Sequence, residues 1–390
     1  MKCCKKMYRR SDYDSDSESG PGYYKPQEKA KRSCMCKVLI WTTAILVFYF
    51  CSFSLLLLAF LVIWVIFPLV FMNTISLQRT LMFPNFDQPE NPQYESYKLY
   101  GAKGVKNRYI TVKDLYNETD GVSLGVWQVL PADRINATDF DSELRNSEKP
   151  ICIYFHGNSG TRIYPYPMYQ KLREFFHVLA VDYRSYGDST EALLTEKAVV
   201  NDLVQFYYKV LELTNQREVF FWAHSLGTAL STHTLRKITE GHSSAPDRRL
   251  PRALMLEAPF TTMREEIEYH PIGKLFAWLP WFDATIRDPL EENGFHFWTT
   301  TNILSVNCPI MIVHAKDDSI IPYTLGEKLA RIAMTERDPV KQGEVTIHII
   351  PESARCDHMD INKYIELPKF ISNFLKDVDE WYNKRTGLKT

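Results

Sequence analysis

Apolar residues are unevenly distributed along this chain, and their longest run lies near the N-terminus. Residues 38–78 contain no Asp, Glu, Lys or Arg, and residues 38–72 are apolar except for Thr, Ser, Tyr, Cys and one Pro. About 20 apolar residues suffice for a helix to cross the hydrocarbon core of a bilayer. The pattern therefore predicts a single transmembrane helix over residues 38–72. The run is too long for the apolar core of a cleavable signal peptide, which favours an uncleaved anchor, and its length argues against a buried core helix. A tight double crossing would need Gly, Pro or polar residues in mid-run, and the one proline, Pro68, lies near the end.

Beyond residue 100 the apolar runs become short and alternate with longer helical patterns. Strands are predicted at residues 107–112, 123–130, 151–155, 177–182, 218–223, 252–257, 309–314 and 344–350. Helices are predicted at residues 166–176, 192–213, 226–239, 323–334 and 368–383. Strands that alternate with helices typically form a mostly parallel sheet with helices on both faces, so we expect an α/β fold.

One insertion, at about residues 259–305, interrupts this alternation. It is rich in aromatic side chains, namely Tyr269, Phe276, Trp278, Trp281, Phe282, Phe295, Phe297 and Trp298. One interpretation is a helical excursion that packs on its own core. The other is a lid whose aromatic face lines an acyl-chain pocket or touches a bilayer.

Charge divides the chain at the apolar run. Residues 1–37 carry ten basic and five acidic groups, whereas the whole chain has 46 basic and 47 acidic residues. By the positive-inside rule, residues 1–37 are predicted to form a disordered cytosolic tail. Residues 101–390 then form a lumenal or extracellular domain, joined to the membrane by a linker over residues 73–100. The balanced total charge argues against a nucleic-acid-binding protein.

Two N-x-S/T sequons agree with this orientation. They place candidate glycosylation sites at Asn117 and Asn136, between the apolar run and the core of the predicted domain. Single triplets of this kind are common by chance, but none occurs in the basic tail. The sequence therefore favours a single-pass type II membrane glycoprotein.

The sequence AHSLG at residues 223–227 follows a predicted strand and opens a predicted helix. A serine between a strand and a helix, with small residues two before and two after it, is typical of a nucleophile elbow. Ser225 is therefore the candidate nucleophile. Ala223 replaces the glycine that usually stands first in this pattern.

A serine nucleophile needs a histidine base that a carboxylate holds in the correct tautomer. In α/β-hydrolases the acid and then the histidine follow the serine along the chain. Asp318, after a buried strand, is the candidate acid, with Asp317 as the alternative; His358, after the last strand, is the candidate base. His348 lies within a strand and is predicted to be packed, and His224, adjacent to the serine, is predicted to point away from the site.

The remaining requirement is an oxyanion hole. A glycine-bearing turn, HGNSG at residues 156–160, follows the strand at 151–155, and its N–H groups can stabilise a developing oxyanion. The predicted donors are the backbone N–H groups of Asn158 and Leu226. The turn lacks the spacing of a phosphate-binding loop, and no zinc-binding spacing occurs, so no metal or cofactor is expected.

Six segments resemble one known family. They are FHGNSGT at 155–161, VDYRSYGDS at 181–189, HSLGT at 224–228, EAPFT at 257–261, FAWLPWF at 276–282 and the stretch 308–322. Over roughly residues 100–370, lid included, the chain is similar to the membrane-anchored α/β-hydrolase-domain serine hydrolases that act as lysophosphatidylserine lipases. The family's fold is the α/β-hydrolase fold.

The resemblance implies a function. It implies hydrolysis of the acyl ester of lysophosphatidylserine, a lipid substrate in the bilayer, with monoacylglycerols as secondary substrates. It assigns Ser225, Asp318 and His358 as nucleophile, acid and base, on the lumenal or outer face of the endoplasmic reticulum or plasma membrane. The alternatives are a cytosolic-facing protein palmitoyl-thioesterase and a hydrolase-like receptor or scaffold without turnover; no protein partner can be inferred.

Overall fold

The structure of the protein is a computed structural model that describes residues 27–386 except 90–91, 96, 118 and 243–248. The chain divides into two compact units, Met1–Ile63 and Trp64–Thr390, which are considered separately. Most of the predicted cytosolic tail, residues 1–37, lies outside the described residues.

The described part of the first unit is helix α1 (Gln27–Leu61), which no Gly or Pro interrupts. The hydroxyls of Thr42 and Thr43 donate to the Leu39 carbonyl at 2.9 and 2.8 Å, so both polar groups have partners within the helix. Along the chain, a π turn, η1 (Val62–Ile66), and helix α2 (Phe67–Asn73) follow directly. Within the described residues, one helical stretch, Ser33–Asn73, is long and apolar enough to cross a membrane.

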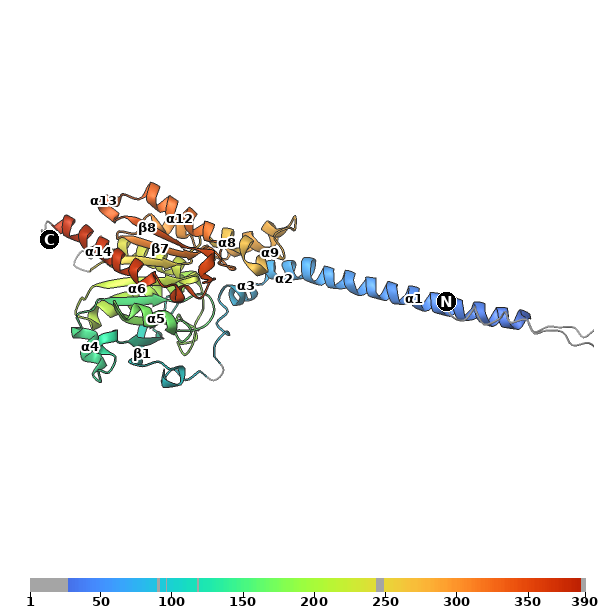
Figure 1. Ribbon diagram of the computed structural model, residues 1–390, viewed down its shortest axis with the longest axis horizontal. Coiled ribbons are helices and arrows are strands. Elements are labelled where there is room, and N and C mark those ends of the chain that lie inside the picture. The colour runs from blue at the N-terminus through green and yellow to red at the C-terminus, as the bar shows by residue number, and fades with distance from the viewer. Residues whose placement is uncertain (1–26, 90–91, 96, 118, 243–248, 387–390) are drawn as a thin grey trace, which may run out of the picture. The chain divides into compact units, whose positions relative to one another are not determined.

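The second unit is built on one eight-stranded sheet (Figure 1). The strands are β1 (Val105–Lys113), β2 (Gly121–Val129), β3 (Ile151–Phe155), β4 (His177–Val181), β5 (Val219–His224), β6 (Ala253–Glu257), β7 (Ile310–Ala315) and β8 (Val345–Ile350). Their order is β1-β2-β4-β3-β5-β6-β7-β8. The pairs β1–β2 and β2–β4 are antiparallel, and all pairs from β4–β3 to β7–β8 are parallel.

Helices cover both faces of this sheet. They include α5 (Tyr166–Leu172), α6 (Glu196–Leu213), α7 (Leu226–His242), α12 (Tyr323–Glu336) and α14 (Leu367–Thr386). Side chains of α6, α7 and α12 belong to one hydrophobic core, and those of α5 and α14 belong to a second core on the other face. Strands β3, β5, β6 and β7 consist only of buried residues, as expected for strands that are covered twice. The predicted α/β-hydrolase fold is confirmed.

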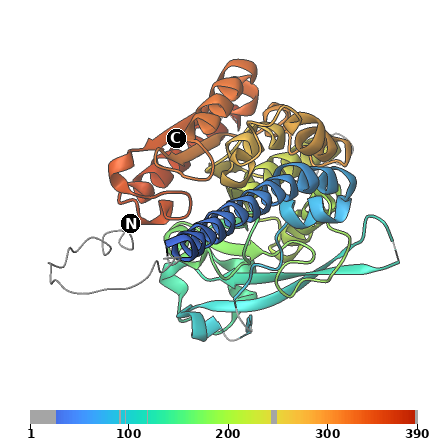
Figure 2. The same cartoon turned by 90° about the vertical axis from the view of Figure 1, so that its right-hand side faces the viewer.

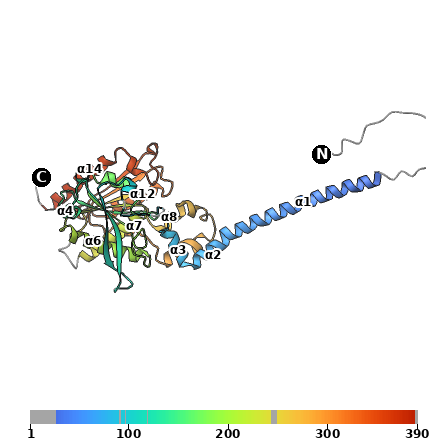
Figure 3. The same ribbon diagram turned by 90° about the horizontal axis from the view of Figure 1, so that it is seen from below.

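All eight predicted strands are present, but several helices were not predicted as separate elements, and those of the insertion only as a helical excursion. They are α3 (Ile75–Met82), α4 (Phe140–Asn146), α8 (Met263–Tyr269), α9 (Pro271–Lys274), α10 (Asp288–Glu292), α11 (Thr299–Ile303) and α13 (Pro339–Gln342), with the π turn η4 (Asp283–Arg287). The aromatic insertion between β6 and β7 contains α8–α11 and is called the lid below. In Figures 2 and 3, α2 and α3 lie beside the lid. Because α3 lies within residues 73–100, part of the segment predicted as a linker is helical.

Candidate active site

Ser225 lies in a sharp turn between β5 and α7. Its φ angle is +52°, in the left-handed region that a residue other than glycine rarely adopts. Two residues on, a Cβ at Gly227 would lie 2.4 Å from the Phe155 carbonyl oxygen, so β3 and α7 approach too closely for a side chain. Ala223 is fully buried in the sheet, where the methyl group is accommodated. The strained turn that the sequence predicts at this serine is present.

Asp318 and His358 lie on loops that follow neighbouring strands, β7 and β8. The His358 Nδ1 and Asp318 Oδ2 atoms are 2.8 Å apart, and the Asp318 side chain is fully buried. The other carboxylate oxygen, Oδ1, accepts the backbone N–H groups of Ile320 and Ile321 at 2.9 and 2.8 Å. The carboxylate is thus held by its own loop while it bonds the imidazole.

Burial and hydrogen bonding set the charge states of this pair. Burial raises the pKa of Asp318, but hydrogen bonds from His314 and His358 outweigh it and hold that pKa well below its usual value. Burial lowers the pKa of His358, and the hydrogen bond to Asp318 opposes this only in part. At neutral pH the pair is therefore a carboxylate beside a neutral imidazole, the state in which His358 can accept a proton.

Sequence reasoning missed the role of His314, the fifth residue of β7. Its Nε2 atom lies 3.1 Å from Asp318 Oδ2 and 3.0 Å from the Ile321 carbonyl oxygen. Because both neighbours are acceptors, Nε2 carries the proton and donates to them. His314 is therefore a positioning residue for Asp318, and only the spacing of four residues along a strand end could have suggested it.

The loops that carry Asp318 and His358 are also bonded to each other. The Ser319 N–H donates to Asp357 Oδ1 at 2.8 Å, and the Asp357 N–H donates to Asp317 Oδ2 at 3.2 Å. Asp317 thus bonds the backbone next to His358 and does not bond the imidazole. Of the two aspartates that the sequence left open, the one in contact with the histidine is Asp318.

The two other histidines occupy different environments. His348 stacks on Phe370 with ring centroids 3.9 Å apart, as expected for a packed strand residue. The prediction that His224 points away from the site is wrong, because its ring centroid lies 4.8 Å from that of His358. Its Nδ1 atom is nevertheless directed toward Glu257, 3.6 Å from a carboxylate oxygen.

The turn after β3 lies beside Ser225. A Cβ at Gly157 would be 3.4 Å from Ser225 Cβ. Two buried tyrosines hold this turn, since the Tyr183 hydroxyl donates to the His156 carbonyl at 2.7 Å and the Tyr186 hydroxyl to the Asn158 carbonyl at 2.6 Å. Asn158 and Leu226, the predicted oxyanion-hole residues, both line the pocket that contains Ser225.

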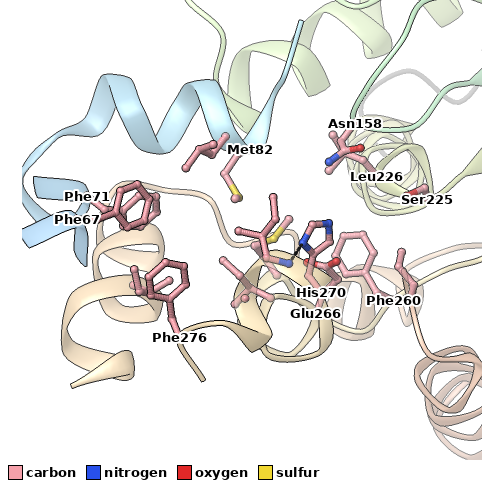
Figure 4. Close-up of a pocket in the computed structure, with 17 residues that line it drawn as sticks. Phe67, Phe71, Met82, Asn158, Ser225, Leu226, Phe260, Glu266, His270 and Phe276 are labelled. Atoms are coloured by element: carbon pink, nitrogen blue, oxygen red, sulfur yellow. Dashed lines mark hydrogen bonds between the residues drawn. The ribbon is translucent and has the colours of Figure 1, made fainter. Parts of the chain in front are cut away.

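This pocket is mainly apolar (Figure 4). Ser225, Asn158 and Leu226 lie at one side, and Phe67, Phe71 and Phe276 lie at the opposite side. The remaining lining residues are Leu81, Met82, Phe260, Met263, Glu266, Ile267, His270, Ile272, Gly273, Ile286 and Ile321. Ser225 thus lies at one end of an apolar pocket.

This chain is similar to a family of hydrolases and to individual lipases. A family model described as alpha/beta hydrolase fold matches residues 150–264. Lysophosphatidylserine lipase ABHD12 of Danio rerio is 29% identical over 80% of this chain and 81% of its own length. The protein of that name from Rattus norvegicus is 31% identical over 77% and 74%, and Protein ABHD12B of Homo sapiens is 33% identical over 55% and 59%.

The solved structures add evidence on the fold alone. The Pyrococcus furiosus esterase Pf2001 matches with a TM-score of 0.51 at 15% identity, over 74% of this chain and 96% of the esterase. At that identity the likeness extends to the sheet and its helices and carries no information about substrate.

Proposed function

This chain belongs to the family of the lysophosphatidylserine lipases ABHD12, and from this membership we propose that it hydrolyses the acyl ester of lysophosphatidylserine, with monoacylglycerols as secondary substrates. It is a carboxylic ester hydrolase of the α/β-hydrolase fold. The roles of nucleophile, base and acid are proposed for Ser225, His358 and Asp318.

The proposed mechanism has two steps. The Ser225 hydroxyl loses its proton to His358 Nε2 while its oxygen attacks the ester carbonyl carbon. The resulting oxyanion accepts hydrogen bonds from the N–H groups of Asn158 and Leu226. The ester C–O bond then breaks, His358 returns the proton to the departing glycerol oxygen, and water cleaves the acyl-enzyme by the same route to release a fatty acid.

One observation carries this proposal: Ser225, in the strained turn, lines an apolar pocket, and the ring of His224, the residue before it, lies 4.8 Å from that of His358, which is bonded to Asp318. The left-handed backbone stores strain that a packing serine would not need. The pocket supplies an environment for an acyl chain, and the neutral imidazole supplies a base.

A lipid panel tests the substrate class. We expect the detergent-solubilised full-length chain to cleave lysophosphatidylserine faster than lysophosphatidylcholine, and monoacylglycerol at a lower but measurable rate, in an assay of released fatty acid. A palmitoylated peptide serves as the competing substrate. If its thioester were cleaved faster than every lysolipid in the panel, the thioesterase alternative would replace the lipase.

Membrane topology is proposed as single-pass type II, with the catalytic domain in the lumen of the endoplasmic reticulum or outside the cell. The side chains of Asn117 and Asn136 are both exposed, as a glycan acceptor must be. We expect the protein expressed in a secretory system to lose apparent mass on glycosidase treatment, and the double variant Asn117→Gln/Asn136→Gln to lack that shift. An unshifted wild-type chain would instead support a cytosolic catalytic domain.

A further inference from the structure

The far side of the active-site pocket comes from a segment that the sequence pattern assigns to the membrane. Phe67 and Phe71 belong to α2, within the apolar run 38–72, and both line the pocket that holds Ser225 (Figure 4). Leu81 and Met82, at the end of α3, line it as well. The run thus contributes to the substrate site.

The length of the apolar stretch leaves these residues free for that role. The stretch Ser33–Asn73 has 41 residues, whereas about 20 are enough to cross the hydrocarbon core. The boundary between the two compact units falls between Ile63 and Trp64, so α2 belongs to the unit that contains the catalytic domain. Spanning the membrane therefore does not require α2.

Helix α2 presents two different faces. Phe67 and Phe71, four residues apart, lie on one face. Phe71 is only 2% exposed, and Phe67 stacks on Phe276 of the lid with ring centroids 5.3 Å apart. Leu69, on the opposite side of the helix, is 48% exposed, and Val70, at the edge of the inner face, is 47% exposed. The inner face is packed against the lid, and the outer face is apolar but uncovered.

Hydrogen bonds fix this segment to the lid. The Trp64 indole N–H donates to the Leu275 carbonyl at 2.8 Å, and the Trp281 indole N–H donates to the Trp64 carbonyl at 3.1 Å. Further along, the buried Gln78 donates to the Phe71 carbonyl at 2.8 Å and accepts from Asn293 of the lid at 2.8 Å. These bonds at both ends make the segment an integral wall of the pocket.

The polar groups in the pocket do not oppose an apolar occupant. Glu266 is the acidic side chain among the lining residues, and burial, with the charge of Asp318 second, raises its pKa to about 8. Burial also lowers the pKa of His270. Both groups are therefore uncharged at neutral pH. An uncharged lining suits a hydrocarbon chain and disfavours a charged head group beside Glu266 and His270.

We infer that the part of this pocket lined by α2, α3 and the lid is the acyl-chain subsite, and that Phe67 and Phe71 limit the length of chain it accepts. The inference rests on the proposed function, since it assigns the acyl part of the same ester. The carbonyl carbon lies at Ser225 and the methyl end of the chain points to the two phenylalanines.

The test is a chain-length profile of the full-length protein. We expect Phe71→Trp to lower kcat/KM for oleoyl lysophosphatidylserine by about tenfold or more, because the added ring removes space for about two buried methylene groups. Activity on the octanoyl analogue should change by less than about twofold, since a short chain does not reach α2. Phe67→Trp, at a less tightly buried position, should also lower the ratio of activity on the oleoyl substrate to activity on the octanoyl analogue (the long-to-short ratio).

The matched control is Leu69→Trp, which adds an indole to the outer face of the same helix. Its long-to-short ratio should equal that of the wild type. Fluorophosphonate labelling of each variant reports whether the site is folded; if Phe71→Trp fails to label, Phe67→Trp decides. An unchanged ratio in a variant that labels normally, or an equal shift in Leu69→Trp, overturns the inference.

A second substrate series separates this inference from the proposed function. Butyryl and palmitoyl esters of p-nitrophenol carry no lipid head group, so their ratio reports the acyl subsite alone. If the wild type cleaves these esters but not lysophosphatidylserine, the proposed substrate is wrong. The change in the palmitoyl-to-butyryl ratio of Phe71→Trp still tests whether α2 limits the acyl subsite. If the lipid is cleaved and neither series shifts, only the acyl subsite is wrong.

Discussion

Ser225→Ala is expected to lower kcat for lysophosphatidylserine roughly a million-fold, the loss found when the nucleophile of a serine hydrolase is removed. The physical reason is that the variant lacks the attacking hydroxyl, and the nearby Thr228 hydroxyl donates to the backbone carbonyl of residue 225 at 2.6 Å. The base and the pocket remain intact, so KM should change little. The measurement is released fatty acid under single-turnover conditions, together with fluorophosphonate labelling of wild type and variant.

The control for this experiment is Ser159→Ala, which removes a hydroxyl from the turn after β3. Ser159 is on the loop that carries Asn158, but it is not among the residues that line the pocket. This variant should keep its labelling and most of its activity. Labelling that persisted in Ser225→Ala would place the reactive group elsewhere. A wild type that neither labels nor turns over would favour the hydrolase-like receptor or scaffold.

Local patterns were enough to predict the sheet and the strained turn at Ser225. Strands such as β7 are short, mostly apolar runs bounded by turn residues. A strand that is buried on both faces needs apolar side chains at nearly every position. Ser225 is recognisable in the sequence because a tight turn accepts only small residues two positions before and after it. Gly227 is one of them, and a Cβ there would lie 2.4 Å from the Phe155 carbonyl oxygen. Both signals depend on residues adjacent in sequence.

Contacts that depend on how a loop folds back, or on a distant segment, could not be predicted in this way. His314 looks like any residue at a strand end until the loop after β7 folds back and places Asp318 beside it. Phe67 and Phe71 lie in a run where every residue suits a lipid environment, so composition cannot distinguish a pocket wall from a membrane-facing side chain. The distinction comes from the lid, which is more than 200 residues away in the sequence.

Asp318→Asn is expected to reduce kcat by about ten-thousand-fold while leaving the fold intact. The Asp318 side chain is enclosed by donors, with two backbone N–H groups on Oδ1 and the histidines His314 and His358 on Oδ2. An asparagine can present only one carbonyl oxygen. If this oxygen keeps the backbone N–H groups, its NH₂ group faces His358 Nδ1, which must then act as an acceptor. The imidazole proton moves to Nε2, where it prevents His358 from taking the proton of Ser225.

Asp317→Asn provides a control that differs by one position and carries the same chemical change. The Asp317 carboxylate accepts the Asp357 N–H at 3.2 Å, and the carbonyl oxygen of an asparagine can accept it equally well. Its kcat should therefore fall by less than about threefold. Near-ultraviolet circular dichroism of both variants establishes that the site is folded. A larger loss in Asp317→Asn than in Asp318→Asn would exchange the two roles, because the acid is then the residue whose replacement leaves His358 in the wrong tautomer.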